Sequence, residues 1–182
     1  SRHATEFISV DIEVSWVESH HDIMAIQEQL LTRGLAAVKE QHGAEIKELF
    51  DVDVVVPSLP FPRIALADAI DIVAARGHEI VRGGDMDPEG ERQIAAHVAE
   101  KFGHEFVFLT DYPSTVRPFY HMRHADNPSL TKSYDLIWRG TEITTGAQRE
   151  HRLDVLIEQV KREREEMDRG ILPLTVIREK PE

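Results

Sequence analysis

The 182-residue sequence contains no cysteine, which excludes both a disulfide scaffold and a thiolate metal site. It also lacks any apolar run of 18 residues, the length needed to span a membrane, and residues 1–6 lack the apolar core of a signal peptide. Basic residues are outnumbered by acidic ones, 21 to 33. The resulting net charge of -12 argues against a chain that binds nucleic acid unaided. We therefore expect one soluble, cytoplasmic globular domain.

The clearest local pattern is a strict alternation of apolar and other residues between positions 8 and 16. Apolar side chains occupy every second position: Ile8, Val10, Ile12, Val14 and Trp16. Period-two alternation predicts a half-buried antiparallel strand. The opposite face carries Phe7, Asp11 and Glu13, and the alternation alone leaves open whether this face is simply solvated or forms part of a site.

The remaining sequence predicts helices separated by short strands. Helices are expected at 22–41, 65–75, 88–102 and 150–168, and strands at 52–56, 106–110, 116–122, 134–138 and within 140–146. The third helix has the sharpest start, because Asp87 can cap it and Pro88 suits its first position. We expect the first helix to end at Gly43. This order of elements predicts an α+β fold, with an antiparallel or mixed sheet flanked by helices.

The histidines do not suggest a metal site. Ten are present, but apart from the adjacent His20 and His21, followed by Asp22, none has the spacing of metal ligands on a helix. We expect them to be solvated or to cap helices.

Polar residues that a core does not need gather first at the N-terminus. Arg2 and His3 could hold phosphate oxygens, while Phe7 offers a flat surface on which a base could stack. The alternative is a frayed chain terminus without a role. A second cluster, residues 116–123, places Arg117 beside an aromatic pair, and its alternative is an edge strand with solvated arginines.

Two further clusters adjoin at residues 133–140 and 142–149 and contain Asp135, Glu142, Thr145 and Arg149. Carboxylate and hydroxyl oxygens suit Mg²⁺, a hard cation that commonly accompanies phosphates. Arginine suits a carboxylate, which it can bind through two parallel hydrogen bonds. Together these residues indicate a site for a nucleotide and an acidic small molecule, although an ordinary ion pair between Glu142 and Arg149 stays open as an alternative.

Read jointly, these clusters resemble the catalytic domain of class II aminoacyl-tRNA synthetases, and most closely the archaeal type of the aspartyl-tRNA synthetase family. The resemblance rests on six blocks in the family's order: residues 2–7, Asp11-x-Glu13, 60–64, 110–113, 117–120 and 133–149. It begins within the family's motif 2, and its glycine-rich motif 3 does not occur in the sequence. We expect a truncated catalytic domain over residues 1–170 and a divergent tail over 171–182.

The resemblance implies a role for each site residue. It implies ATP binding by Arg2, His3, Ala4, Phe7 and Glu142. It implies Mg²⁺ ligation by Asp135, Glu142 and Thr145. It implies aspartate binding by Thr145 and Arg149. No catalytic nucleophile is implied, so that catalysis would rest on positioning and charge stabilisation.

The resemblance further implies an aspartate–tRNA ligase that uses ATP and Mg²⁺ to convert L-aspartate to aspartyl-adenylate and then charges tRNA. The complete enzyme is expected to be a homodimer without a membrane segment. Two alternatives remain open within the same fold. One is an asparaginyl-tRNA synthetase or an asparagine-synthetase-like ligase, and the other is a non-catalytic truncated paralogue that keeps the fold for binding.

Overall fold

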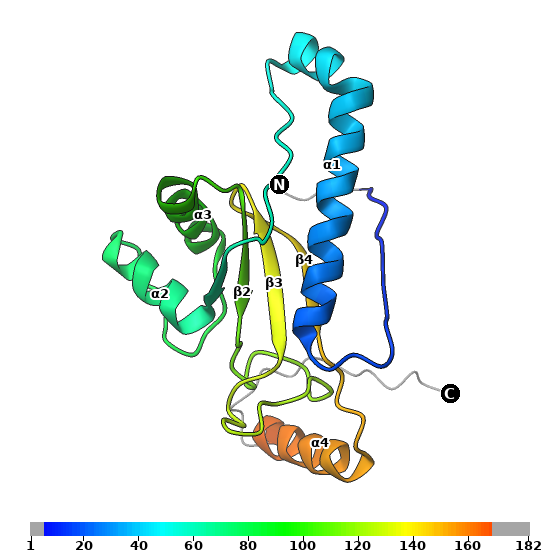
Figure 1. Cartoon of the computed structure of the whole chain (residues 1–182). Coiled ribbons are helices and arrows are strands. Elements are labelled where there is room, and N and C mark those ends of the chain that lie inside the picture. Colours follow the sequence, from blue (N-terminus) through cyan, green and yellow to red (C-terminus); the bar gives the residue numbers. More distant parts are fainter. Residues whose placement is uncertain (1–5, 169–182) are drawn as a thin grey trace.

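The computed structural model describes residues 6–168, which form a four-stranded sheet with helices on both faces (Figure 1). In chain order the elements are α1 (His20–Phe50), β1 (Arg63–Ala65), α2 (Leu66–Ala75), α3 (Pro88–Phe102), β2 (Phe106–Thr110), β3 (Ser133–Trp138), β4 (Thr141–Ala147) and α4 (Leu153–Asp168). The strands lie in the order β1-β2-β3-β4, with β1 parallel to β2 and the other pairs antiparallel. The predicted mixed sheet flanked by helices is confirmed.

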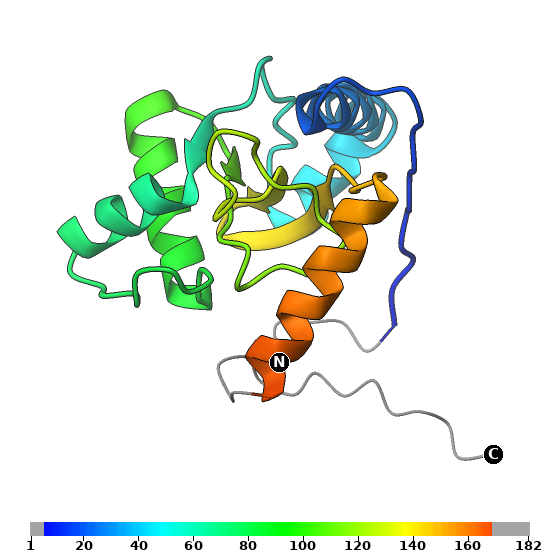
Figure 2. The same cartoon turned by 90° about the horizontal axis from the view of Figure 1, so that it is seen from below.

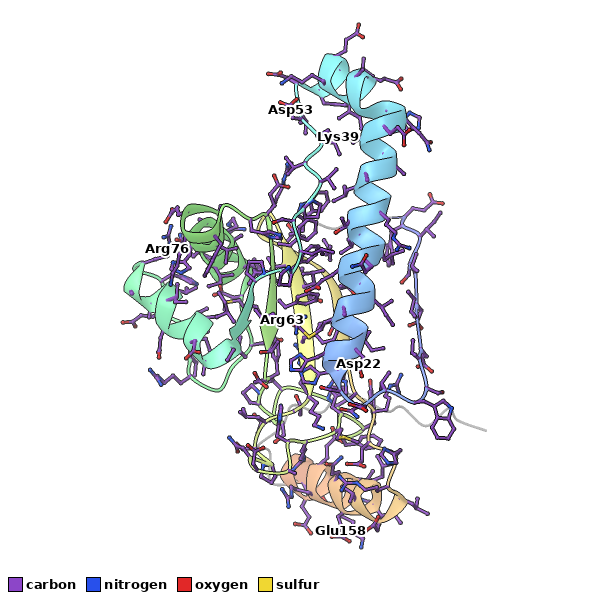
Figure 3. All side chains as sticks on the ribbon, viewed as in Figure 1. Asp22, Lys39, Asp53, Arg63, Arg76 and Glu158 are labelled. Carbon is purple, nitrogen blue, oxygen red and sulfur yellow. The ribbon has the colours of Figure 1, made fainter. Side chains whose placement is uncertain are left out.

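The sheet carries a separate apolar cluster on each face, because side chains alternate along β2. Val107 and Leu109 pack on the side of α2 and α3, whereas Phe106 and Phe108 pack on the side of α1. Figures 1 and 2 show α2 and α3 on one side of the sheet and α1 on the other. Side chains fill the space between these layers (Figure 3). Burial on both faces explains why the run at 106–110 was recognisable as a strand.

A side-chain cap sets the start of α3, and local hydrogen bonds to Glu150 precede the start of α4. The Asp87 carboxylate accepts a hydrogen bond from the Gly90 N–H at 2.7 Å and Pro88 occupies the first helical position, so the helix predicted at 88–102 is confirmed. Helix α4 begins three residues later than predicted. The Glu150 carboxylate accepts hydrogen bonds from the backbone and the guanidinium of Arg152, which keeps these residues outside the helix.

Helix α1 is longer than predicted and continues through Gly43 to Phe50. A glycine costs an exposed helix only about 1 kcal/mol, and the helix formers that follow it outweigh this cost. The helix ends where Asp51 adopts the left-handed conformation, with its N–H donating to the Lys47 carbonyl. At about 1.5 Å per residue, α1 is long enough to extend past the sheet (Figure 1). In the part of the chain that the structure describes, no helix is long and apolar enough to cross a membrane.

Two predicted strands are wrong. Residues 8–16 and 52–56 are both irregular, and Ile8 is 96% exposed. Alternation shows only that a segment could be half-buried, whereas a strand also needs a neighbour to accept and donate its ladder hydrogen bonds. Within residues 6–168, neither segment pairs with another strand. Residues 52–56 instead form part of the return from the end of α1 towards β1 (Figure 1).

The strand predicted at 116–122 is also wrong, because this run forms turns. The Val116 N–H donates to the Pro113 carbonyl and the His121 N–H donates to the Pro118 carbonyl. Pro118 has no N–H to give to a ladder. Only the end of the run is extended, where His121 forms an isolated antiparallel bridge with Arg149.

His20, at the start of α1, is a buried histidine rather than the solvated or capping one expected from the sequence. Its side chain is 2% exposed and lies near the rings of His21, His124 and Tyr134. Burial, reinforced by the charge of His21, lowers the pKa of His20 to about 4. The neutral imidazole is therefore the form that the fold accommodates.

We expect this burial to make the stability depend on pH. The unfolded chain binds a proton at His20 near pH 6.5, whereas the folded chain binds it only near pH 4. The free energy of unfolding is therefore highest above pH 6.5 and decreases as the pH falls towards 4. Between pH 7 and pH 5 the wild type should lose roughly 2 kcal/mol more stability than a His20→Leu variant. Urea unfolding at both pH values measures this difference. Equal losses in the two proteins would contradict it.

Candidate functional site

The candidate site lies on the α2–α3 face of the sheet, where β3 and β4 pair. Asp135 on β3 stands opposite Thr145 on β4. Further along, a bulge shifts the register between Leu136 and Ile137, so that Glu142 stands opposite Ile137. Because Ile137 belongs to the cluster packed against α2 and α3, the register places Asp135, Thr145 and Glu142 on this same face.

A buried ion pair forms the centre of the site. Arg117 pairs with Asp135, and the two side chains are only 11% and 5% exposed. The Arg117 guanidinium lies 3.7 Å from the centre of the Tyr112 ring and donates a 3.4 Å hydrogen bond to the Thr145 hydroxyl. Burial and the neighbouring Asp135 raise the pKa of Tyr112, which keeps the phenol protonated. Arg117 is thereby fixed from three sides.

Glu142 adds a second carboxyl group near Asp135. The pKa of Glu142 is raised to about 7. Partial burial of its carboxyl group is the largest cause, and the negative charges of Asp135 and Glu91 add to it. The backbone N–H of Glu142 donates to the carboxylate of Glu91 at 3.2 Å. The carboxyl groups at this position therefore repel one another, a condition that a bound cation would relieve.

Arg149 lies two residues beyond the end of β4, at the surface. Its guanidinium pairs with Glu13 at 2.9 Å and lies 4.8 Å from the centre of the Tyr120 ring. Both charged side chains are well exposed, 64% for Arg149 and 75% for Glu13, so the pair contributes little to stability. The alternative ion pair between Glu142 and Arg149 is not observed, since within residues 6–168 Arg149 pairs with Glu13.

His121 connects Arg149 to the buried ion pair. The bridge between His121 and Arg149 aligns their backbones, and the charges of Arg117, Arg149 and Asp135 all act on the imidazole. Burial, then the charges of Arg117 and Arg149, lower the pKa of His121 to about 4. The imidazole is therefore neutral at pH 7 and adds no charge between the two arginines.

Of the residues singled out in the sequence, the structure places Asp135, Glu142 and Thr145 on one sheet face, and Arg149 beside His121 just after β4. Phe7 is 78% exposed, and the expected contributions of Arg2, His3 and Ala4 fall outside the described residues, as do the tail residues 171–182.

Sequence reasoning missed three residues of the site. Arg117 and His121 lay in a cluster that was noted, but no spacing rule connected them with residues 133–149. Glu91 carried no signal of its own, because an acidic residue in the first turn of a helix is ordinary. Only the folded chain shows that it reaches β4.

The oxygen-rich donor set suits Mg²⁺. One carboxylate oxygen of Asp135, Oδ1, is buried without a hydrogen-bond partner among the described residues. Within that same part of the chain, no group of three or more histidine, aspartate or glutamate side chains is placed to hold a metal ion. This arrangement fits a magnesium ion held by one or two carboxylates, with substrate phosphates and water completing its shell.

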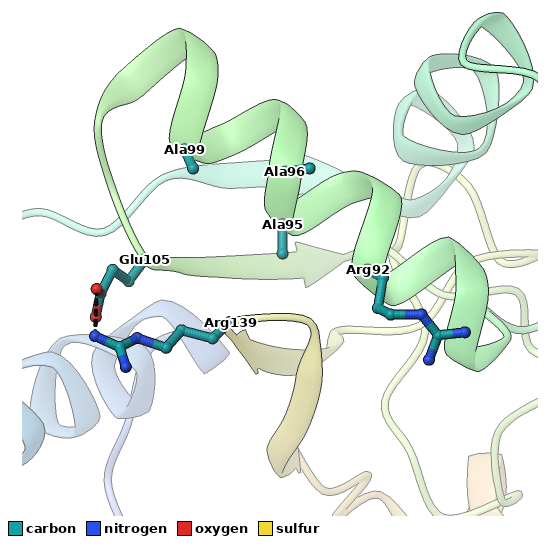
Figure 4. A pocket seen from close by; sticks show the side chains of 6 residues that line it. All are labelled: Arg92, Ala95, Ala96, Ala99, Glu105 and Arg139. Atoms are coloured by element: carbon teal, nitrogen blue, oxygen red, sulfur yellow. Dashed lines mark hydrogen bonds and ion pairs between the residues drawn. The ribbon is translucent and has the colours of Figure 1, made fainter. Parts of the chain in front are cut away.

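A shallow pocket lies beside the turn between β3 and β4. It is lined by Arg92, Ala95, Ala96, Ala99, Glu105 and Arg139 (Figure 4). Both of its arginines are engaged, Arg92 with Glu89 and Arg139 with Glu105. The pocket shares no lining residue with the site around Asp135, and we treat it as separate.

Known sequences similar to this chain include tRNA ligases. The family of class II tRNA synthetases (D, K and N) matches residues 1–171. The aspartate–tRNA(Asp) ligase of Pyrococcus abyssi is 38% identical over 161 residues, which are 88% of this chain and 36% of that protein. The aspartate–tRNA(Asp/Asn) ligase of Aeropyrum pernix is 42% identical over 163 residues, again 88% of this chain and 37% of that protein. The chain thus spans little more than a third of the length of these relatives.

Solved structures similar to this chain also include tRNA synthetases. An aspartyl-tRNA synthetase from Entamoeba histolytica aligns with a TM-score of 0.73 at 26% identity, over 88% of this chain and 32% of that one. An asparaginyl-tRNA synthetase from Pyrococcus horikoshii aligns with a TM-score of 0.70 at 28% identity, over 81% of this chain and 35% of that one. The latter enzyme has also been solved complexed with asparaginyl-adenylate.

Proposed function

We propose, on the premise that this chain belongs to the class II tRNA synthetases (D, K and N), that it forms part of the catalytic domain of an aspartate–tRNA ligase. Residues 1–170 are assigned to this domain and residues 171–182 to a divergent tail. The complete protein would act on L-aspartate, ATP and tRNA, as a homodimer in the cytoplasm.

The observation that carries the proposal is that the β3–β4 pair and the residues just after it supply two chemistries. The carboxyl groups of Asp135 and Glu142 suit a cation with phosphates, and the guanidinium of Arg149 suits a carboxylate. Arg149 already holds the carboxylate of Glu13 at the surface, and an acidic ligand could replace Glu13 at little cost because that pair is exposed.

In the proposed reaction, an oxygen of the aspartate α-carboxylate attacks the α-phosphorus of ATP. The new O–P bond forms as the bond to pyrophosphate breaks, and the terminal hydroxyl of tRNA then takes the aspartyl group and releases AMP. No side chain of this chain forms a covalent bond, so its residues act by holding the reactants in line.

The position of each residue in or near the candidate site indicates which part of the ligands it would contact. Arg149 would bind the side-chain carboxylate of aspartate. Thr145 would bind the neighbouring polar groups of the same substrate. Arg117, which pairs with Asp135, donates a hydrogen bond to the Thr145 hydroxyl and would hold it in place. Asp135, Glu142 and Thr145 would hold Mg²⁺, which when bound would neutralise phosphate charge. Glu142 would also contact ATP.

The remaining ATP contacts are proposed near the N-terminus. Arg2, His3 and Ala4 would hold the phosphates of ATP, and Phe7 would stack on its adenine.

One observation favours a second candidate. The similarity to an asparaginyl-tRNA synthetase nearly equals that to an aspartyl-tRNA synthetase in TM-score. An asparagine-specific enzyme would need to recognise an amide where we propose a carboxylate. The exposed guanidinium of Arg149 favours the acid, since arginine offers only donors and carries a full charge.

Calorimetric titration of the chain with non-hydrolysable analogues of aspartyl-adenylate and asparaginyl-adenylate tests the proposal. We expect saturable binding that is at least tenfold tighter for the aspartyl analogue, because an ionic hydrogen bond is about twice as strong as a neutral one. Preference for the asparaginyl analogue would support the second candidate. The absence of binding to both would contradict a preformed adenylate site in this chain.

The same titration with ATP tests the magnesium ligands. Adding Mg²⁺ should tighten ATP binding by the wild type, and Glu142→Gln should remove most of this gain because the amide lacks the charge that attracts the cation. Glu89→Gln is the matched control, since Glu89 pairs with Arg92 away from the site. An equal gain in Glu142→Gln and wild type would exclude Glu142 as a ligand.

A further inference from the structure

Glu91, in helix α3, is a buried carboxylate beside the candidate site. It lies in the first turn of α3, where acidic residues complement the helix dipole. Glu89, in the same turn, does this while pairing with Arg92 at the surface. The Glu91 residue is instead only 4% exposed. Burying a carboxylate is costly unless hydrogen bonds satisfy it, so its position calls for a structural or functional reason.

One hydrogen-bond partner of Glu91 lies on another element, β4. The Glu91 carboxylate accepts a hydrogen bond from the backbone N–H of Glu142 at 3.2 Å. Glu142 stands at the bulge between β3 and β4, where the regular ladder of hydrogen bonds is interrupted. The Glu91 carboxylate on α3 therefore accepts a backbone hydrogen bond beside the bulge, where the ladder between β3 and β4 is interrupted.

The start of α3 is held firmly enough to act as a fixed support. Gly90 is so closely packed that a Cβ there would lie 2.3 Å from the Met86 sulfur. On the other side of Glu91, a Cβ on Gly140 would lie 3.1 Å from the Cα of Arg92. The helix backbone thus contacts the 80–86 segment just before Glu91 and the β3–β4 turn just after it. Glu91 has little freedom to move relative to Glu142.

We propose that Glu91 is a positioning residue, which holds the start of β4 so that the Glu142 side chain faces Asp135 and a bound divalent cation. The inference rests on the proposed function, because it assigns Glu91 to the support of a magnesium ligand. Residues that hydrogen-bond to a metal-ligating residue orient that ligand, and their loss commonly lowers metal affinity by about 10- to 100-fold.

Two variants separate the position of the group from its charge. Glu91→Asp keeps the charge but is one methylene too short to reach the Glu142 N–H. Glu91→Gln keeps the reach and a carbonyl acceptor but removes the charge. Glu89→Asp is the matched control in the same turn, at a partly exposed carboxylate that accepts hydrogen bonds from Arg92 and Gln93 of its own helix.

The experiment titrates ATP into the chain with and without Mg²⁺ and follows hydrogen exchange at the Glu142 amide by NMR. In Glu91→Asp, we expect the Mg²⁺-dependent gain in affinity to fall about tenfold and the amide to exchange at least tenfold faster. Glu91→Gln should retain slow exchange and most of the gain, and Glu89→Asp should match the wild type. The amide signals also report whether each variant is folded.

Each contrary result has a distinct meaning. If the wild type gains affinity with Mg²⁺ and Glu91→Asp gains equally, the positioning role is overturned while the proposed function stands. If Glu91→Gln is as weak as Glu91→Asp, charge rather than position is responsible, and the inference is again overturned. If the wild type does not bind ATP at all, the proposed function of this chain fails and the inference fails with it.

Discussion

Replacing Arg149 with alanine should weaken binding of a non-hydrolysable aspartyl-adenylate analogue at least a hundredfold. Removing one partner of a hydrogen-bonded charge pair in a binding site costs roughly 2–5 kcal/mol, and arginine binds a carboxylate through two parallel hydrogen bonds. The fold should not suffer, because the Arg149 side chain is 64% exposed and its pair with Glu13 is a surface pair. Calorimetry measures the affinity, and thermal unfolding confirms the fold.

Arg152→Ala is the matched control for this experiment. Arg152 is a nearby exposed arginine that pairs with a carboxylate, that of Glu150, outside the proposed site. We expect its variant to bind like the wild type. Arg149→Lys should fall between wild type and alanine, because lysine keeps the charge but not the two-pronged geometry. Wild-type affinity in Arg149→Ala would show that the carboxylate binds elsewhere, and Arg117 would then be the next residue to test.

Replacing Asp135 with alanine should lower the free energy of unfolding by roughly 3–5 kcal/mol, the usual cost of removing one partner from a buried ion pair. The reason is the burial of Arg117, which is 11% exposed and would be left with an uncompensated charge against Tyr112. Urea unfolding at pH 7 measures the loss. A change below about 1 kcal/mol would mean that water or another group reaches Arg117 in the variant.

A double variant distinguishes the cost of an unpaired charge from the value of the pair. Replacing both Arg117 and Asp135 with leucine leaves no charge buried, and such exchanges are often neutral or stabilising. We expect the double variant to recover most of the stability that Asp135→Ala loses, while losing affinity for the adenylate analogue. An equally unstable double variant would show that the ion pair itself stabilises this fold.

Parts of the fold were predictable because their signals are local. The cap at Asp87 and the proline after it mark the start of α3 without reference to the rest of the chain. The buried run at 106–110 lies in the middle of the sheet, where both faces favour apolar residues. The segment at 8–16 failed because its alternation carries no information on whether a partner strand is present, and the turns at 116–122 failed because Pro118 interrupts an otherwise strand-like run.

The candidate site was predictable only in part, for a related reason. Asp135, Glu142, Thr145 and Arg149 lie close in sequence, so a hairpin of two strands is enough to bring their elements together. The other contributors arrive from a distance. Arg117 contacts Asp135 across 18 positions, and Glu91 contacts Glu142 across 51 positions. No periodicity connects residues so far apart, and their meeting is a property of the folded chain.

The bulge in the β3–β4 pair bears on how this region can change in evolution. Beyond the bulge, Glu142 pairs with Ile137, whereas an uninterrupted ladder continued from Thr144 opposite Leu136 would pair it with Trp138 instead. A shift of one residue turns a side chain to the other face of a sheet. Without the bulge, at the present length of β4, Glu142 would therefore face α1, whereas deleting the exposed Ile143 would remove the bulge and leave Glu142 opposite Ile137. Evolution can therefore exchange or remove Ile143 here without turning Glu142 away from Asp135, as long as Glu142 stays opposite Ile137.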